Sequence, residues 1–144
     1  MEHVASFANI PIRVEHPKND PLALAKTLLH ELYSLVNKLL QTNENSILDL
    51  RALPPLGAEG YKFLKEQLGI GEVKVHIQSF GRSDIQGTAY PGIWWVTHYN
   101  QDDELLTEML EVGFVPQLLK DPKDEVILGQ CKLYELLQTL KAAS

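Results

Sequence analysis

The part of the sequence that decides the fold is residues 88–99, which read TAYPGIWWVTHY. This stretch contains both tryptophans of the protein, and its Pro91-Gly92 pair predicts a turn that leads into a strand over residues 93–99. Leaving a tryptophan side chain in water is costly, and tryptophan is enriched at protein–protein interfaces. The stretch is therefore either a packed strand of the core or a docking surface.

The residues on both sides of this stretch predict an antiparallel meander. Val73, Val75 and Ile77 alternate with polar residues, which is the period of a half-buried strand. The expected strands of the meander are residues 73–78, 85–90, 93–99 and 104–112, with turns at 81–84 and 100–103. The apolar residues of the last segment also suit a helix, but a strand closes the meander and is favoured. Short strands are predicted at residues 10–14, as an edge strand, and 46–50.

Three main helices accompany the strands. Asp20 is a good N-cap and Pro21 a good first helical residue, so the first helix is predicted to begin there. Helices are expected at residues 20–42, 58–68 and about 123–140, with one helical turn within 115–119. The order of elements predicts an α+β fold: a mainly antiparallel sheet, made of a meander of about four strands plus one short strand, packed with three main helices.

Composition limits the class of protein. The 144 residues fit a single domain spanning residues 1–144. Net charge is −6 and the 13 basic residues are dispersed, which argues against a nucleic-acid partner. No apolar run is long enough to span a membrane, and from residues 1–4 we expect no signal peptide. One cysteine excludes an internal disulfide framework, so a cytoplasmic location is expected.

No catalytic or metal-binding constellation accompanies the aromatic stretch. Zinc-protease, paired-cysteine, serine-hydrolase and phosphate-loop motifs are missing from the sequence, so we expect no enzyme activity, no metal and no cofactor. Among the five histidines, His76 and His98 lie on neighbouring predicted strands, but two ligands are too few for a structural zinc site. Cys131 is interpreted as a small packing residue of the last helix.

Three ordered blocks of sequence resemble a known family. They are residues 69–73 (GIGEV), 88–94 (TAYPGIW) and 110–116 (LEVGFVP). Together they are similar to the conserved C-terminal region of hydrogenase expression/formation proteins of the HupH type, and the resemblance covers residues 53–124. The residues that match the family motif are Thr88, Pro91, Gly92, Trp94, Glu111, Gly113 and Pro116. Trp95 departs from the pattern, since family members often carry a basic residue there.

The resemblance implies an accessory, non-catalytic role in the maturation of nickel–iron hydrogenase. It implies a chaperone-like protein that binds the immature hydrogenase small subunit and works with other maturation factors. In the third block, Gly113 is expected to permit the backbone turn that ends the strand, and Pro116 to begin the next segment.

Adjacent residues of a regular strand point to opposite faces, so Trp94 and Trp95 are expected on opposite faces of the sheet. The tryptophan on the less covered face is the candidate anchor for the client. Trp94, Trp95, Tyr90 and Tyr99 are therefore the candidate partner-binding residues. The alternative is that both tryptophans are buried, one by the helices and one by another segment or a second subunit.

Two other functions remain open from the sequence. One is an enzyme or small-molecule-binding protein whose pocket is lined by His76, His98, Arg82 and Tyr99. The other is a structural dimerisation domain that forms a homodimer through the open face of its sheet.

Overall fold

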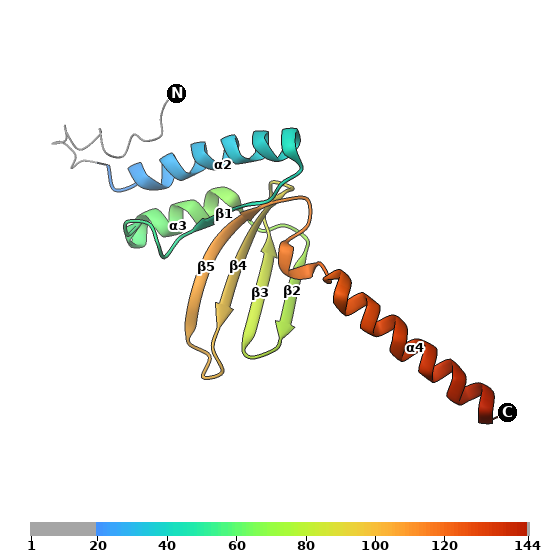
Figure 1. Cartoon of the computed structure of the whole chain (residues 1–144). Coiled ribbons are helices and arrows are strands. Elements are labelled where there is room, and N and C mark those ends of the chain that lie inside the picture. Colours follow the sequence, from blue (N-terminus) through green and yellow to red (C-terminus); the bar gives the residue numbers. More distant parts are fainter. Residues whose placement is uncertain (1–19, 144) are drawn as a thin grey trace. The chain divides into compact units, whose positions relative to one another are not determined.

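The computed structural model describes residues 20–143 (Figure 1). Its elements are α2 (Ala23–Thr42), β1 (Ser46–Asp49), α3 (Gly57–Leu68), β2 (Lys74–Gln78), β3 (Arg82–Gly87), β4 (Ile93–Tyr99), β5 (Leu105–Val112), the 3-10 helix η3 (Gln117–Leu119) and α4 (Lys123–Ala143). The edge strand expected at residues 10–14 lies outside the described residues. The chain separates into two compact units, one ending at Phe114 and the other beginning at Val115, and the expected single domain stays a prediction.

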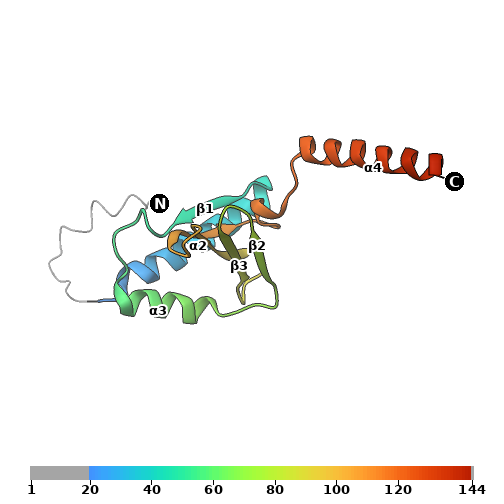
Figure 2. The same cartoon turned by 90° about the horizontal axis from the view of Figure 1, so that it is seen from below.

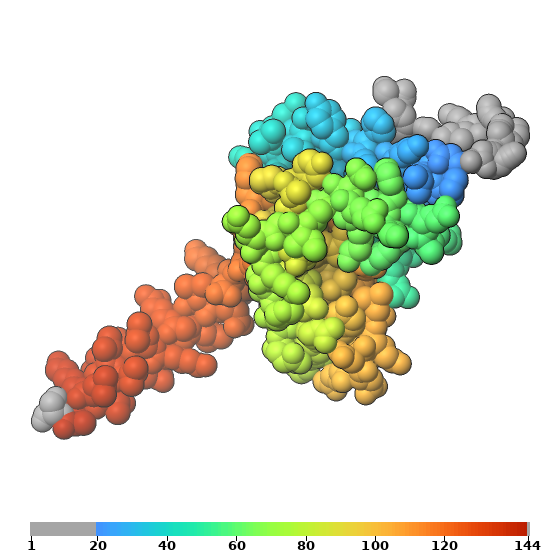
Figure 3. Space-filling view, turned by 180° about the vertical axis from the view of Figure 1, so that it is seen from behind, coloured from blue at the N-terminus to red at the C-terminus, as the bar shows by residue number. Residues whose placement is uncertain are grey.

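The first unit contains the sheet, whose strand order is β1-β5-β4-β3-β2 with every neighbouring pair antiparallel. Strands β2 to β5 form the expected meander, and the short strand β1 pairs with β5 at the opposite edge from β2. The α+β class and the antiparallel sheet are confirmed, as is the strand rather than helix at β5. Helices α2 and α3 lie side by side (Figure 3) and on one side of the sheet (Figure 2).

The core lies between these two helices and the sheet. Strand β4 contributes Ile93 and Trp95 to it, and β5 contributes Leu110 and Val112, as the alternation of a half-buried strand requires. The helices supply a buried apolar stripe formed by Ala25, Leu28, Leu32, Leu39, Leu64 and Leu68. Burying such side chains contributes roughly 1.5–3 kcal/mol for each large one, so this seam holds the strands in place for the site described below.

The first helix begins slightly later than the sequence predicts. A carboxylate oxygen of Asp20 accepts a hydrogen bond from the backbone N–H of Leu22 at 2.9 Å, and residues 21–22 form a turn before α2 starts at Ala23. The hydrogen bond from Leu22, and then that from Lys26, lower the pKa of Asp20. The predicted end of α3 is confirmed, because Gly69 follows Leu68 with a φ of 68° that favours glycine.

The predicted boundaries of β3 are wrong. The strand runs from Arg82 to Gly87 rather than over residues 85–90, and the turn expected at 81–84 lies at 79–81, where Ser79 N–H donates to the carbonyl of Gly81. The physical reason is cross-strand pairing: Asp84 lies opposite His76, and the Nδ1 atom of His76 is 2.6 Å from a carboxylate oxygen of Asp84, a contact that stabilises a polar stretch in extended form.

The second unit contains η3 and α4. The 3-10 helix falls within the helical turn expected at 115–119, and α4 confirms the predicted last helix. Every side chain of α4 that the structure describes is exposed, and the packing of this helix with the sheet stays a prediction. Across residues 20–143, no helix combines the length and the apolar character needed to cross a bilayer.

Candidate functional site

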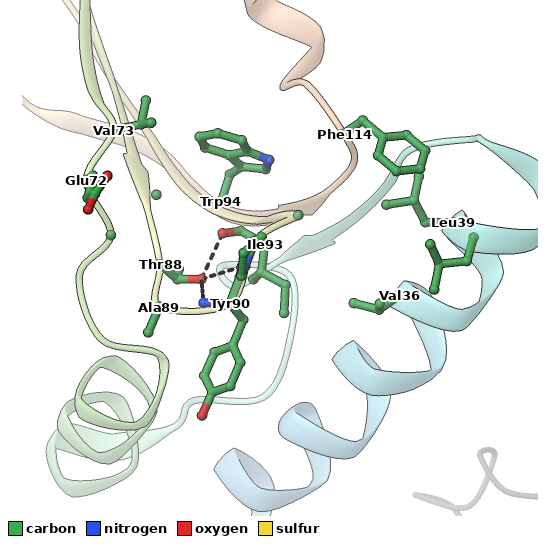
Figure 4. Close-up of a pocket in the computed structure, with 15 residues that line it drawn as sticks. Val36, Leu39, Glu72, Val73, Thr88, Ala89, Tyr90, Ile93, Trp94 and Phe114 are labelled. Atoms are coloured by element: carbon green, nitrogen blue, oxygen red, sulfur yellow. Dashed lines mark hydrogen bonds between the residues drawn. The ribbon is translucent and has the colours of Figure 1, made fainter.

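The three sequence blocks meet around one hollow of the first unit, which we call the motif hollow. Its volume is about 670 Å³, and its lining is mostly apolar. It is lined by Gly71, Glu72 and Val73 of the first block, Gly87 and residues 88–94 of the second, Phe114 of the third, and Val36, Leu39 and Leu40 of α2. Figure 4 shows the side chains that surround it: Tyr90 comes from the turn between β3 and β4, Trp94 from β4, and Val36 and Leu39 from α2.

Thr88 holds the turn that shapes this hollow. Its side chain is buried, and its hydroxyl lies 2.9 Å from the carbonyl oxygen of Ile93 and 3.1 Å from that of Tyr90, so one proton is shared between them. The same oxygen accepts a hydrogen bond from the N–H of Tyr90 at 3.1 Å (Figure 4). Gly92 has a φ of 96° in the turn, which explains the Pro91-Gly92 pair.

The first block packs backbone to backbone against the second. Gly71 N–H donates to the carbonyl of Gly87 at 2.8 Å, and Ala89 N–H donates to the carbonyl of Leu68 at 2.8 Å. A Cβ atom on Gly71 would collide with the carbonyl oxygen of Thr88. Glycine is therefore required at position 71 by the close approach of two backbones.

The third block joins the second through a tryptophan. The indole nitrogen of Trp94 donates to the carbonyl of Gly113 at 3.0 Å. Glu111 is only 3% exposed and accepts a hydrogen bond from the side-chain amide of Asn45 at 2.7 Å. A Cβ atom on Gly113 would collide with that amide. Gly113 lacks a positive φ, so close packing against Asn45, and not the expected backbone turn, explains this glycine. Pro116 directly precedes η3, as expected for the start of the next segment.

The two tryptophans point to opposite faces of the sheet, as predicted. Trp95 is 6% exposed and belongs to the core under the helices, where it meets the ring of Tyr61 edge to face at 5.7 Å. Trp94 is half-buried on the other face and has the greater exposure of the two, and Tyr90 is exposed. The assignment of Trp94, Trp95, Tyr90 and Tyr99 to partner binding stays a prediction.

The histidine pocket expected from the sequence is not assembled. The Nδ1 atom of His76 lies 2.6 Å from a carboxylate oxygen of Asp84, and Nδ1 of His98 lies 2.7 Å from the hydroxyl of Ser83. Ser83 and Asp84 are adjacent in β3 and point to opposite faces, so the two histidines do as well. The alternative pocket lined by both histidines is therefore contradicted, because β3 separates β2 from β4.

The other two residues of that predicted pocket, Arg82 and Tyr99, lie together. The guanidinium of Arg82 stacks 4.1 Å from the ring centroid of Tyr99 and donates to Asp84 at 3.2 Å. Partial burial of Asp84 raises the pKa of its carboxyl, but the hydrogen bond from His76 and the charge of Arg82 outweigh it and hold that pKa below its ordinary value. This cluster ties the β2–β3 hairpin to the end of β4.

A second hollow, which the sequence reasoning missed, surrounds Glu108 of β5, and we call it the Glu108 hollow. Its volume is about 750 Å³, and its lining includes Tyr61, Lys65, Trp95 and Tyr99. Glu108 is 8% exposed, and its Oε2 atom accepts hydrogen bonds from the hydroxyl of Tyr61 and the indole nitrogen of Trp95, both at 2.6 Å. Burial, and then the hydrogen bond with Glu108, raise the pKa of Tyr61 well above its ordinary value. The sequence did contain a signal for this residue: Glu108 lies two and four residues before Leu110 and Val112 in a strand, so all three side chains point to the core face.

Comparison with known proteins matches the chain to one family. The family model described as HupH hydrogenase expression protein, C-terminal conserved region, matches residues 22–140. A curated relative, the hydrogenase expression/formation protein HupQ of Azotobacter chroococcum mcd 1, is 37% identical over 90 residues, which are 62% of this chain and 32% of the relative. The hydrogenase expression/formation protein HupH of Rhodobacter capsulatus is 25% identical over 125 residues, which are 87% of this chain and 45% of the relative.

A solved structure extends the comparison to the fold. The hydrogenase expression protein HupH from Thiobacillus denitrificans ATCC 25259 is similar with a TM-score of 0.75 and 37% sequence identity, over 80% of this chain and 95% of that chain. The chain spans less than half the length of the curated relatives just described. The family match also reaches beyond residues 53–124, over which the three blocks show their resemblance. The chain therefore belongs to the family of the C-terminal conserved region of the HupH hydrogenase expression protein.

Proposed function

We propose that this chain is a non-catalytic accessory protein of nickel–iron hydrogenase maturation, and that it binds the immature hydrogenase small subunit in a chaperone-like way. Membership of a family described by hydrogenase expression supports the role in maturation. The names of the curated relatives, which refer to hydrogenase expression and formation, support it further. We expect the encounter in the cytoplasm, together with other maturation factors.

The motif hollow is the observation that carries the binding part of the proposal. All three blocks of the family motif contribute to this one surface, and its rim includes exposed apolar side chains: Leu40 is 66% exposed, Tyr90 53% and Phe114 57%. Exposed apolar groups gathered around a hollow are typical of a docking surface. We assign contact with the client to Trp94 and Tyr90 of this hollow, while Trp95 and Tyr99 line the Glu108 hollow.

The way the hollow is built suits a preformed docking site. The hydrogen bond from Trp94 to Gly113 fixes the indole, and the bonds of Thr88 fix the turn that carries Tyr90. Side chains that are already ordered lose little entropy when a partner binds, which raises the affinity that a small apolar surface can reach. The client would be held by apolar contacts and released when its assembly covers the bound segment.

The test is retention of the purified small subunit by immobilised full-length chain. Replacing Trp94 by alanine is expected to weaken retention about tenfold or more, since truncating an anchor of an interface costs about 2 kcal/mol. The matched control is Phe80→Ala, because Phe80 is 86% exposed and lines neither hollow. Full retention by a folded Trp94→Ala variant would contradict the proposed docking site.

A further inference from the structure

The Glu108 hollow holds a buried carboxylate that uses only one of its oxygens. The Oε2 atom of Glu108 accepts both the Tyr61 and the Trp95 hydrogen bonds. Within the described residues, its Oε1 atom has no hydrogen-bond partner and the carboxylate has no ion-pair partner. Both donors are neutral groups, and Glu108 is 8% exposed, so in the described residues this buried carboxyl group has no cation within ion-pair distance.

The aromatic wall of the same hollow already carries a cation from the chain itself. The ammonium of Lys65 lies 4.6 Å from the centroid of the Trp95 ring and 5.7 Å from that of Tyr61. Lys65 is exposed and stands in the last turn of α3 on a flexible stem, so its ammonium can leave without disturbing the core. The wall is thus suited to a cation, and its present occupant can be exchanged.

The remaining lining favours the same kind of ligand. Three acidic residues, Glu66, Asp84 and Glu108, line the hollow against two lysines, and Gln86 and Thr97 add side-chain oxygens. An anionic ligand would be repelled by these carboxylates, whereas a guanidinium or ammonium group can stack on an indole and donate to a carboxylate at once. The net charge of −6 on the whole chain favours a basic partner in the same way.

We propose that the Glu108 hollow binds a cationic side chain, arginine or lysine, of a partner polypeptide, which displaces Lys65 from the Trp95 ring and reaches the free oxygen of Glu108. Both residues offer the same chemistry, a cation with several N–H donors. This inference does not rest on the proposed role in hydrogenase maturation, because it follows from the hollow alone.

The test is a titration of the full-length, nitrogen-15-labelled chain with blocked tripeptides Gly-X-Gly, followed by NMR of the indole N–H signals. X is arginine, lysine, citrulline or norleucine. Citrulline keeps the shape of arginine without its charge, and norleucine is the uncharged counterpart of lysine. The arginine or the lysine peptide is expected to shift the Trp95 signal and leave the Trp94 signal in place, since Trp94 lies on the opposite face. The stronger of the two peptides identifies the residue type.

Two variants give the direction of the effect. Lys65→Met removes the internal competitor and is expected to strengthen peptide binding about two- to fivefold, the range that an exposed cation–π contact represents. The matched control is Lys62→Met, which removes the same charge from α3 outside the hollow and is expected to change nothing. Glu108→Gln is expected to weaken binding about tenfold or more, because it replaces the carboxylate by a neutral amide and so removes the charge that strengthens a hydrogen bond from a cation.

Three results would overturn the proposal: binding of the uncharged citrulline or norleucine peptide as strong as that of the better of the two charged peptides, weaker binding by Lys65→Met, or no shift of the Trp95 signal with any peptide. If Glu108→Gln fails to fold, the Lys65→Met and citrulline arms still decide. Because no hydrogenase subunit is used, failure here leaves the retention test of Trp94→Ala untouched.

Discussion

At the scale of single residues, the family motif is explained by contacts that join its three blocks. Thr88 ties the turn together, Gly71 lets two backbones meet, and the indole of Trp94 reaches the carbonyl of Gly113. Glu111, two residues before Gly113, accepts a hydrogen bond from the side-chain amide of Asn45. Each of these residues therefore shapes the motif hollow, and Trp94 both shapes it and lines it.

Gly113→Ala tests this account of the third block. The added methyl group would displace the amide of Asn45 from Glu111, so the free energy of unfolding is expected to fall by about 1.5–3 kcal/mol, the range for a hydrogen bond to a carboxylate. Urea unfolding measures it. The matched control is Gly129→Ala in α4, where the new Cβ atom meets nothing within 4 Å and stability is expected to stay the same or rise slightly. Equal stability of the Gly113→Ala variant and the parent would contradict the account.

At the scale of elements, the sequence predicted β2 correctly from its alternating apolar residues, and β4 correctly from the Pro91-Gly92 turn that precedes it. It failed at the start of β3, because the extended form of residues 82–84 depends on partners across the hairpin that local propensity does not contain. Strand period also placed Trp94 and Trp95 on opposite faces. It could not tell which is buried, because that depends on the face that α2 and α3 cover.

The β2–β3 hairpin is expected to weaken in acid. The pKa of Asp84 is lowered in the folded chain, so its ion pairs stabilise the fold fully above the ordinary aspartate pKa of about 4 and less as pH falls through the lowered value. Between about pH 5 and about pH 3, the parent should lose about 1 kcal/mol or less of unfolding free energy through this residue.

Asp84→Asn should remove that part of the acid dependence, as measured by urea unfolding at several pH values. Asp102→Asn is the control, since Asp102 forms no ion pair with any residue in the described part of the chain. An Asp84→Asn variant that loses stability in acid as steeply as the parent would show that the hairpin cluster does not contribute.

At the scale of the whole molecule, the family match runs over residues 22–140 and so includes both compact units. The motif hollow and the Glu108 hollow belong to the first unit alone. Their linings share no residue: Trp94 lines the first, and Trp95, on the opposite face of β4, lines the second. The chain can thus offer a partner two contacts: an apolar one at the motif hollow, and one made of aromatic and acidic side chains at the Glu108 hollow. The sequence alone did not show that these are two sites, because Trp94 and Trp95 are adjacent in it.

The measurement that tests the central claim most directly is replacement of the gene by its Trp94→Ala form in the organism that carries it. Processing of the hydrogenase small subunit and hydrogenase activity are then followed at equal levels of the variant and the parent chain, with the Phe80→Ala replacement as control. The account predicts that the Trp94→Ala strain accumulates unprocessed small subunit and loses most of its hydrogenase activity, while the Phe80→Ala strain behaves as the parent. Normal processing and activity in the Trp94→Ala strain would contradict it.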